Sequence, residues 1–141
     1  MYYSKITLRV RYGETDQMGC VYYGNYALYY EQARVEAIRQ LGLAYKDLEA
    51  AGVYIPVTEY TSRYLRPARY DDMLIIHTTV RSLESRAITF HSVIHNEAGK
   101  RLNEGHVTLV FYDPDTRRRI SMPDILSAKL GPYFQPCDAH T

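Results

Sequence analysis

The sequence of 141 residues contains no tryptophan, only two cysteines and no long apolar run. Cys20 and Cys137 are too few for a disulfide framework, so we expect a reducing compartment, the cytoplasm. No apolar stretch approaches the length of about 20 residues that crosses a bilayer, and we expect no membrane partner. The first ten residues, MYYSKITLRV, also lack the charged start and apolar run of a signal peptide.

An excess of charge of one sign is also missing. The 17 Lys and Arg residues nearly balance the 16 Asp and Glu residues, which gives a formal net charge of +1. Such a chain has no long-range field that would recruit nucleic acid, so we expect no nucleic-acid partner. The length, with 46% hydrophobic and 23% charged residues, predicts one globular domain over residues 1–141. Any binding must therefore come from a local site.

Tyrosine is the residue that the chain has in excess, with 15 copies. Many of them fall between Tyr2 and Tyr70. Tyrosine joins an apolar ring to a polar hydroxyl, which suits half-hydrated pockets as well as cores and subunit contacts. Core packing and subunit contact are the favoured interpretation for most of these rings.

The segment from Val10 to Gly42 joins a strand pattern to the strongest helix pattern in the chain. Alternation over residues 5–12 predicts a strand that ends at Gly13, and residues 14–24 form a loop that carries Asp16. Helical spacing then predicts a helix over residues 25–41, and the small alanines in it allow close approach to a sheet. Its predicted buried stripe consists of Tyr26, Tyr30, Ala33, Ala37 and Leu41.

The remainder of the chain is rich in residues that favour strands. A weaker helix is expected over residues 44–51, strands over 54–64, 73–82, 86–96 and 102–112, and a short helix from Pro123 to about Lys129. The tail over 133–141 has no periodicity, and we expect it to be mobile. These elements predict an α+β fold, a five-stranded antiparallel sheet with one long helix packed on it. The open edge of such a sheet predicts at least a homodimer.

A set of motifs resembles the hotdog-fold acyl-CoA thioesterases over roughly residues 5–126. The nearer group is the one named for 4-hydroxybenzoyl-CoA thioesterase, with the Tol-Pal-associated short-chain thioesterases as the sister branch. The residues that carry the resemblance are Arg11-Tyr12, Thr15-Asp16, Gly19, Val21-Tyr22-Tyr23, Asn25-Tyr26, Glu31, Ala33-Arg34 and the run from Arg66 to Asp72.

The resemblance implies a long helix wrapped by the sheet, protomers joined into a continuous sheet as a homodimer or homotetramer, and acyl-CoA bound at their interface. It also implies that Asp16 is the catalytic aspartate and that the backbone N–H of Tyr23 contacts the thioester carbonyl. The sister branch has a histidine at the position of Tyr23. A mechanism that uses only the backbone amide is therefore the one compatible with this chain.

Thioester hydrolysis needs a group that delivers water or a nucleophile, and donors where negative charge develops on oxygen. Asp16 can serve as general base or as nucleophile, and the sequence leaves this choice open. The helix N-terminus near Tyr23 offers N–H groups that lack partners within the helix. On position alone Asp16 is better explained as a turn or capping residue, and the surrounding family motif reverses this preference in favour of catalysis.

Further residues are assigned to substrate. We expect Tyr22, Gly24 and Tyr26 beside the thioester, and Arg86 on the phosphates of coenzyme A, where the resembled enzyme has basic residues. Tyr22, Tyr23, Tyr26 and Tyr30 are hypothesised to line an aromatic or medium-length acyl pocket. No metal and no separate cofactor is expected, since coenzyme A is part of the substrate.

Other interpretations remain beside this one. Glu31 and Arg34, three residues apart on the helix, are expected to pair on its surface. Arg117 to Arg119 are expected to be a solvated basic run rather than a phosphate site. The whole chain can alternatively be a binding module for acyl-CoA or acyl carrier protein that has lost turnover. A hotdog dehydratase ranks last, because no Asp-His pair at suitable spacing is visible.

Overall fold

The computed structural model describes residues 1–135. It contains six strands, three α-helices and two 3₁₀ turns. In chain order they are β1 (Tyr2–Arg9), η1 (Tyr12–Glu14), α1 (Asn25–Gln40), α2 (Tyr45–Ala50), β2 (Val57–Tyr64), β3 (Met73–Val80), β4 (Ala87–Asn96), β5 (Arg101–Asp113), β6 (Arg118–Ile120), α3 (Asp124–Leu130) and η2 (Gly131–Phe134).

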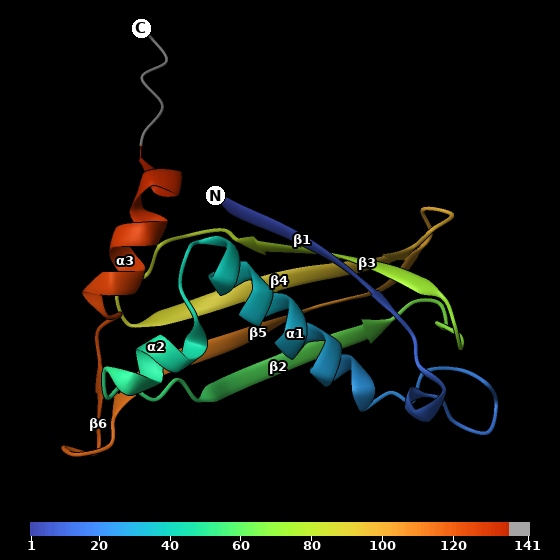
Figure 1. Cartoon of the computed structure of the whole chain (residues 1–141), viewed down its shortest axis with the longest axis horizontal. Helices are drawn as coiled ribbons and strands as arrows, with labels where there is room; N and C mark the ends of the chain where they lie inside the picture. Colours follow the sequence, from blue (N-terminus) through green and yellow to red (C-terminus); the bar gives the residue numbers. More distant parts are fainter. Residues whose placement is uncertain (136–141) are drawn as a thin grey trace, which may run out of the picture.

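The sheet is antiparallel, with the strand order β1-β3-β4-β5-β2 and with β6 added to the end of β5. Helix α1 lies across one face of this curled sheet, and α3 stands at one end of it (Figure 1). Hairpins join β3 to β4 and β4 to β5, and the register between β4 and β5 shifts between Ile94 and His95. This is the helix-on-sheet hotdog architecture that the sequence predicts.

The sequence pattern of α1 explains how it packs. The predicted stripe is confirmed, since Tyr26, Tyr30, Ala33, Ala37 and Leu41 are each at most 8% exposed. Because the two alanines are small, the helix backbone lies close to the sheet, and the Tyr2 hydroxyl of β1 donates to the Ala37 carbonyl at 2.6 Å. The chain leaves the helix through Gly42, whose φ of +92° suits glycine.

The first strand differs from its prediction over residues 5–12. Strand β1 begins earlier, at Tyr2, and ends at Arg9, and Tyr12 then lies 77% exposed in η1. The reason is the pairing of β1 with β3, which runs from Tyr2 opposite Val80 to Arg9 opposite Met73. The apolar alternation continues past the last residue that has a partner strand, so it overestimates the strand.

A sixth strand was missed in the predicted five-stranded sheet. Arg118–Ile120 forms β6, a hairpin partner of β5, although the two arginines that begin it are exposed as expected. The turn before it places Arg117 at a φ of +59°, with its N–H donating to the Asp113 carbonyl. Three residues that include arginines give too weak a strand signal to be read from the sequence alone.

The expected mobile tail is partly ordered. Tyr133 lies in the 3₁₀ turn η2, and its ring contacts the ring of Tyr2 edge to face at 4.9 Å between centroids. The remainder of that predicted tail, residues 136–141, lies outside the described residues and includes Cys137. Among residues 1–135, no helix has both the length and the apolar character needed to cross a membrane.

Strand β2 is the free edge of the sheet on the side of the α1 N-terminus. All its residues are exposed except Ser62, which is half-buried. Its inner edge pairs with β5, and no described strand pairs with its outer edge. Such an edge presents unpaired backbone groups to any further strand.

Candidate active site

The predicted loop connects β1 to α1 through a compact hairpin-like path. Thr15 and Val21 form an isolated bridge, and Cys20 pairs with Arg69 of the segment that precedes β3. The N–H of Val21 donates to the Ala68 carbonyl at 2.8 Å, and Ala68 is fully buried. The Pro67-Ala68 pair of the sequence motif therefore supports the loop that carries Asp16.

Asp16 stands at the start of a tight turn. Its carbonyl accepts the N–H of Gly19, whose φ is +79°, and its N–H donates to the Cys20 carbonyl at 2.8 Å. The carboxylate oxygen Oδ1 accepts the N–H groups of Met18 at 2.9 Å and Cys20 at 3.3 Å. Within residues 1–135, the other oxygen, Oδ2, has no hydrogen-bond or ion-pair partner. The side chain thus has one oxygen fixed and one available.

The N-terminus of α1 presents free donors. The N–H of Asn25 donates to the Tyr22 carbonyl and that of Tyr26 to the Tyr23 carbonyl, while the N–H groups of Tyr23 and Gly24 have no acceptor in the described part of the chain. A Cβ on Gly24 would come within 3.1 Å of the Tyr22 ring, so glycine lets that ring lie over the start of the helix. Free N–H groups at a helix N-terminus attract negative charge.

A hollow of about 400 Å³ lies between this loop, the start of α1 and the end of β2. Both Asp16 and Tyr23 line it, which brings the two predicted catalytic residues to one site. The remaining walls come from Met18, Cys20, Val21, Tyr26, Tyr64, Leu65, Arg66 and Pro67. Most of this lining is apolar, and the polar groups are few, as is common in small-molecule sites.

The four tyrosines of the predicted acyl pocket divide into two groups. Tyr23 and Tyr26 line the hollow, and the Tyr26 ring meets that of Tyr64 edge to face, with 5.4 Å between centroids. Tyr22 is 47% exposed and stacks on Tyr23 outside the lining. Tyr30 lies in the core, where its hydroxyl donates to Asn103, so it does not contribute to the hollow.

Burial raises the pKa of the Tyr26 phenol above its ordinary value of about 10, despite a hydrogen bond to the Ala68 backbone that acts in the opposite direction. Burial likewise raises the pKa of Tyr30. Both phenols therefore stay protonated and neutral at physiological pH. Tyr26 can thus give the hollow an apolar wall without acting as a base there.

Arg86, the basic residue expected on the phosphates of coenzyme A, does not line the hollow. Arg86 precedes β4, where its guanidinium donates to the Arg119 carbonyl at 3.2 Å, while the loop of Asp16 lies at the end of the sheet where β3 begins. The 8-residue strand β3 separates those two ends by about 26 Å at the usual rise per residue. A single chain thus does not bring Arg86 to the hollow. Arg66, which the sequence interpretation did not select, lines it instead.

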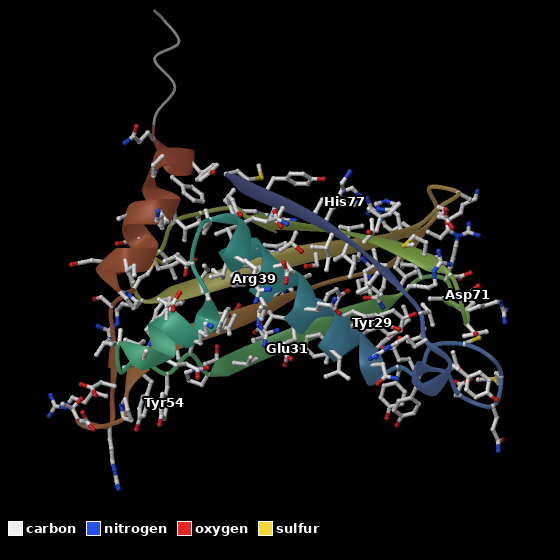
Figure 2. The ribbon with its side chains drawn as sticks, viewed as in Figure 1. Tyr29, Glu31, Arg39, Tyr54, Asp71 and His77 are labelled. Carbon is white, nitrogen blue, oxygen red and sulfur yellow. The ribbon has the colours of Figure 1, made fainter. Side chains whose placement is uncertain are left out.

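The expected surface pair of Glu31 and Arg34 is not formed. In the described residues no ion pair joins them, and the Nε atom of Arg34 is buried without a hydrogen-bond partner. Both side chains line a separate hollow beside the β2 edge, with Leu28 and Tyr60. Figure 2 shows Glu31 on α1, away from the sheet ends.

The part of the chain that the structure describes contains no group of three or more His, Cys, Asp or Glu side chains that could hold a metal ion. The four histidines within residues 1–135 lie in pairs on the sheet. The ring centroids of His77 and His95 are 5.2 Å apart, and those of His91 and His106 are 5.4 Å apart.

Comparison with known proteins identifies the family. A model of the thioesterase-like superfamily matches residues 10–130, which includes the loop, α1 and the whole hollow. The chain belongs to this thioesterase-like superfamily. The Escherichia coli protein named acyl-CoA thioester hydrolase YbgC is 35% identical over 122 residues, which make up 86% of this chain and 91% of that protein.

Solved structures of superfamily members agree with the fold. A DHNA-CoA thioesterase from Staphylococcus aureus is 33% identical, with a TM-score of 0.82 over 95% of this chain and 85% of that one. A 4-hydroxybenzoyl CoA thioesterase mutant complexed with 4-hydroxybenzoyl CoA has the same TM-score, 0.82, at 19% identity over 92% of this chain and 99% of that one, and shows the fold alone.

Proposed function

We propose that this thioesterase-like chain hydrolyses an acyl-CoA or aroyl-CoA thioester to the free acid and coenzyme A. The oxygen of water, or of the Asp16 carboxylate, adds to the thioester carbon, and the carbon–sulfur bond then breaks. With Asp16 as base, the proton of the water passes to its carboxylate and from there to the departing thiolate. With Asp16 as nucleophile, water hydrolyses the mixed anhydride that forms in the first step.

The observation that carries this proposal is the shared hollow. Asp16 and Tyr23 both line it, and the N–H of Tyr23 has no acceptor within the described residues, which supports a thioester site with a base or nucleophile and an oxyanion donor together. Removing one such donor typically costs about 3–4 kcal/mol of transition-state stabilisation. The donors are backbone groups of Tyr23 and Gly24, immediately before α1, so a tyrosine side chain at position 23 is compatible with this role.

The lining of the hollow supports an apolar acyl group. The rings of Tyr26 and Tyr64 form a wall of aromatic edges, which suits a flat aroyl group or a medium-length acyl chain. Gly24 keeps the approach to the helix N-terminus open under the Tyr22 ring. No metal and no separate cofactor takes part in the proposed reaction.

We further propose that the protein acts as at least a homodimer, joined along β2. The exposed outer edge of β2 supports this, because a second copy can extend the sheet there. Light scattering should then give a mass of two or four chains, and the mass of one chain would contradict the proposal. The cytoplasm stays our prediction for the compartment.

Thiol release from short, medium, long and aromatic acyl-CoAs tests the proposed activity. We compare wild type with Asp16→Asn, which keeps the size of the side chain while it removes the charge. Asp115→Asn is the matched control, since Asp115 is exposed in the turn between β5 and β6. We expect Asp16→Asn to lose at least about 100-fold in rate, roughly 2.7 kcal/mol, and Asp115→Asn to keep wild-type turnover.

Two results would contradict the proposal. Wild-type protein that binds acyl-CoA tightly and releases no thiol from any member of the panel is a binding module. Equal turnover by wild type and Asp16→Asn would show that Asp16 is only a turn residue and that another residue of the chain carries out the reaction.

A further inference from the structure

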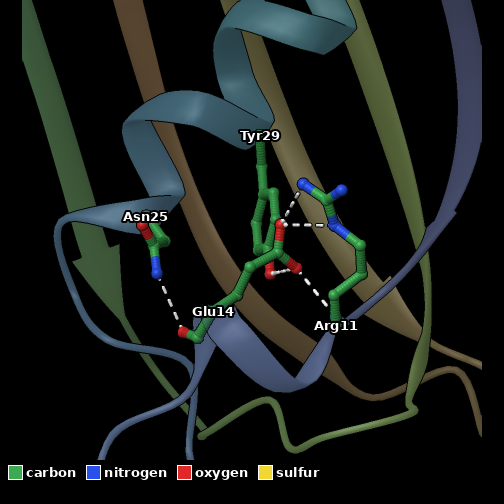
Figure 3. Close-up of polar contacts among 4 residues, drawn as sticks. All are labelled: Arg11, Glu14, Asn25 and Tyr29. Atoms are coloured by element: carbon green, nitrogen blue, oxygen red, sulfur yellow. Dashed lines mark hydrogen bonds and ion pairs between the residues drawn. The ribbon is translucent and has the colours of Figure 1, made fainter.

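Glu14 lies outside the hollow, yet it is the most heavily bonded carboxylate near it. Its side chain is only 16% exposed. Its oxygen Oε1 accepts the backbone N–H of Arg11 at 2.8 Å and the hydroxyl of Tyr29 at 2.9 Å. Its oxygen Oε2 accepts Nε and Nη2 of Arg11 at 3.4 and 3.3 Å (Figure 3). A carboxylate that is mostly removed from water requires partners of this kind.

The backbone of the same residue holds the end of the loop. The Glu14 carbonyl accepts the N–H of Tyr22 at 2.9 Å. It also accepts Nδ2 of Asn25 at 2.8 Å (Figure 3). The residue therefore joins the 3₁₀ turn η1 to the start of α1 through its carbonyl, and to the next turn of α1, at Tyr29, through its side chain. The loop from Thr15 to Val21 begins directly after Glu14 and returns to it through the bond from the Tyr22 N–H. Glu14 is therefore the anchor of both ends of the loop.

Asp16 is two residues from this anchor. Its turn is held by the bridge between Thr15 and Val21 and by its own bonds to Cys20, while Cys20 and Val21 contact Arg69 and Ala68 of the segment that precedes β3. The side chain of Glu14 holds the loop on the side of the helix, because among the described residues its bond from the Tyr29 hydroxyl is the only hydrogen bond between η1 and the Tyr29 turn of α1.

We propose that Glu14 is a positioning residue, whose bonds to Arg11 and Tyr29 hold the Asp16 carboxylate at the reacting carbon. This inference rests on the proposed thioester hydrolysis. A shift of about 1 Å in a catalytic group can cost about 100-fold in rate, so a support outside the hollow can control turnover without contacting substrate.

Tyr29 is well suited to this role. Burial first, and then the hydrogen bond to the Glu14 carboxylate and its charge, raise the pKa of the Tyr29 phenol far above its ordinary value. The phenol therefore remains a protonated donor throughout the neutral pH range. The link between loop and helix is then constant across the working pH range.

The experiment measures kcat and KM for the best acyl-CoA of the panel, together with Tm, for Glu14→Ala and Tyr29→Phe. Glu36→Gln is the matched control, because Glu36 also pairs with an arginine three residues away, Arg39 at 2.7 Å, farther along α1 (Figure 2). We expect Glu14→Ala to lower kcat by about tenfold to 100-fold with KM within about threefold, and Glu36→Gln to change neither.

The decisive measurement repeats Glu14→Ala in the Asp16→Asn background. If Glu14 acts by placing the Asp16 carboxylate, its loss has little further effect once that carboxylate is gone, and kcat falls by less than about threefold. If Glu14 only supports the fold, the same fold-loss appears in both backgrounds, or Tm falls while kcat stays at the wild-type value. Either of these results overturns the inference.

Tyr29→Phe keeps the test usable if Glu14→Ala does not fold. It removes one hydroxyl and leaves the ring and the Arg11 bonds in place, so we expect a severalfold fall in kcat that disappears in the Asp16→Asn background. An unchanged kcat would count against the inference. Wild type that releases no thiol refutes the proposed function and this role with it, whereas active wild type with additive losses refutes the role of Glu14 alone.

Discussion

Replacing Gly105 with alanine should destabilise the sheet next to the site. Gly105 lies in β5 opposite Ser62 of β2 and Ser92 of β4. An added Cβ would be placed 2.0 Å from the carbonyl oxygen of Thr61, 2.9 Å from its carbonyl carbon and 3.1 Å from the Cα of Ser62. All three atoms belong to the backbone, so no side-chain rotation relieves the contact. The strands must separate locally.

The magnitude follows from that separation. Overpacking typically costs about 1–3 kcal/mol, and each weakened hydrogen bond of the β2–β5 ladder adds about 1 kcal/mol. We therefore expect Gly105→Ala to lower the free energy of unfolding by about 3 kcal/mol. For a chain of this length each kcal/mol lowers Tm by roughly 3 °C, so the melting temperature should fall by about 10 °C.

Thermal unfolding followed by calorimetry checks this value. Gly13→Ala is the control, because no atom lies within 4 Å of a Cβ built there and its φ is not positive. It should leave Tm within about 2 °C of wild type, the range of a neutral surface substitution. If Gly105→Ala has the same Tm as Gly13→Ala, the close approach of β2 to β5 at Gly105 is refuted.

Two further predictions concern charge. Arg66→Ala should raise KM for acyl-CoA about tenfold with kcat nearly unchanged, since Arg66 lines the hollow and can hold a phosphate. Arg118→Ala, in β6, serves as the control. Equal KM values for wild type, Arg66→Ala and Arg118→Ala would contradict this role. Burial, then the charges of Arg81 and His106, lower the pKa of His91, so the unfolded chain takes up the proton first and stability falls as pH drops below about 6.5. His91→Gln should therefore lose less stability than wild type between pH 7 and pH 5 in urea titrations, and parallel losses would refute this cause.

The long helix could be predicted because its signal is local. Tyr26, Ala33 and Ala37 repeat with the helical period, and any sheet that covers their face buries them. Strands β2 to β5 could likewise be predicted, because their segments are rich in β-branched and aromatic residues. The hotdog architecture follows from these elements and is confirmed by the structure and by the superfamily match.

The walls of the site could not be predicted in the same way, because they depend on pairing between distant segments. Tyr64 meets Tyr26 only because β2 occupies the edge beside α1, and Arg66 reaches the hollow because the chain leaves β2 at that end. Arg86 was selected through a resemblance in sequence position, and its strand places it at the other end of the sheet. The pairing register between strands could not be predicted from the sequence.

The two interpretations of Asp16, turn residue and catalytic residue, are compatible in this structure. The hydrogen bonds from Met18 and Cys20 are those of a turn, and they hold Oδ1 with two backbone donors. Because those donors belong to the turn itself, they fix the direction of the carboxylate without occupying Oδ2. Turn bonds of this kind are compatible with the catalytic role proposed for Asp16. It follows that a sequence pattern typical of turns is no evidence against catalysis when the same carboxylate also lines a hollow beside a helix N-terminus.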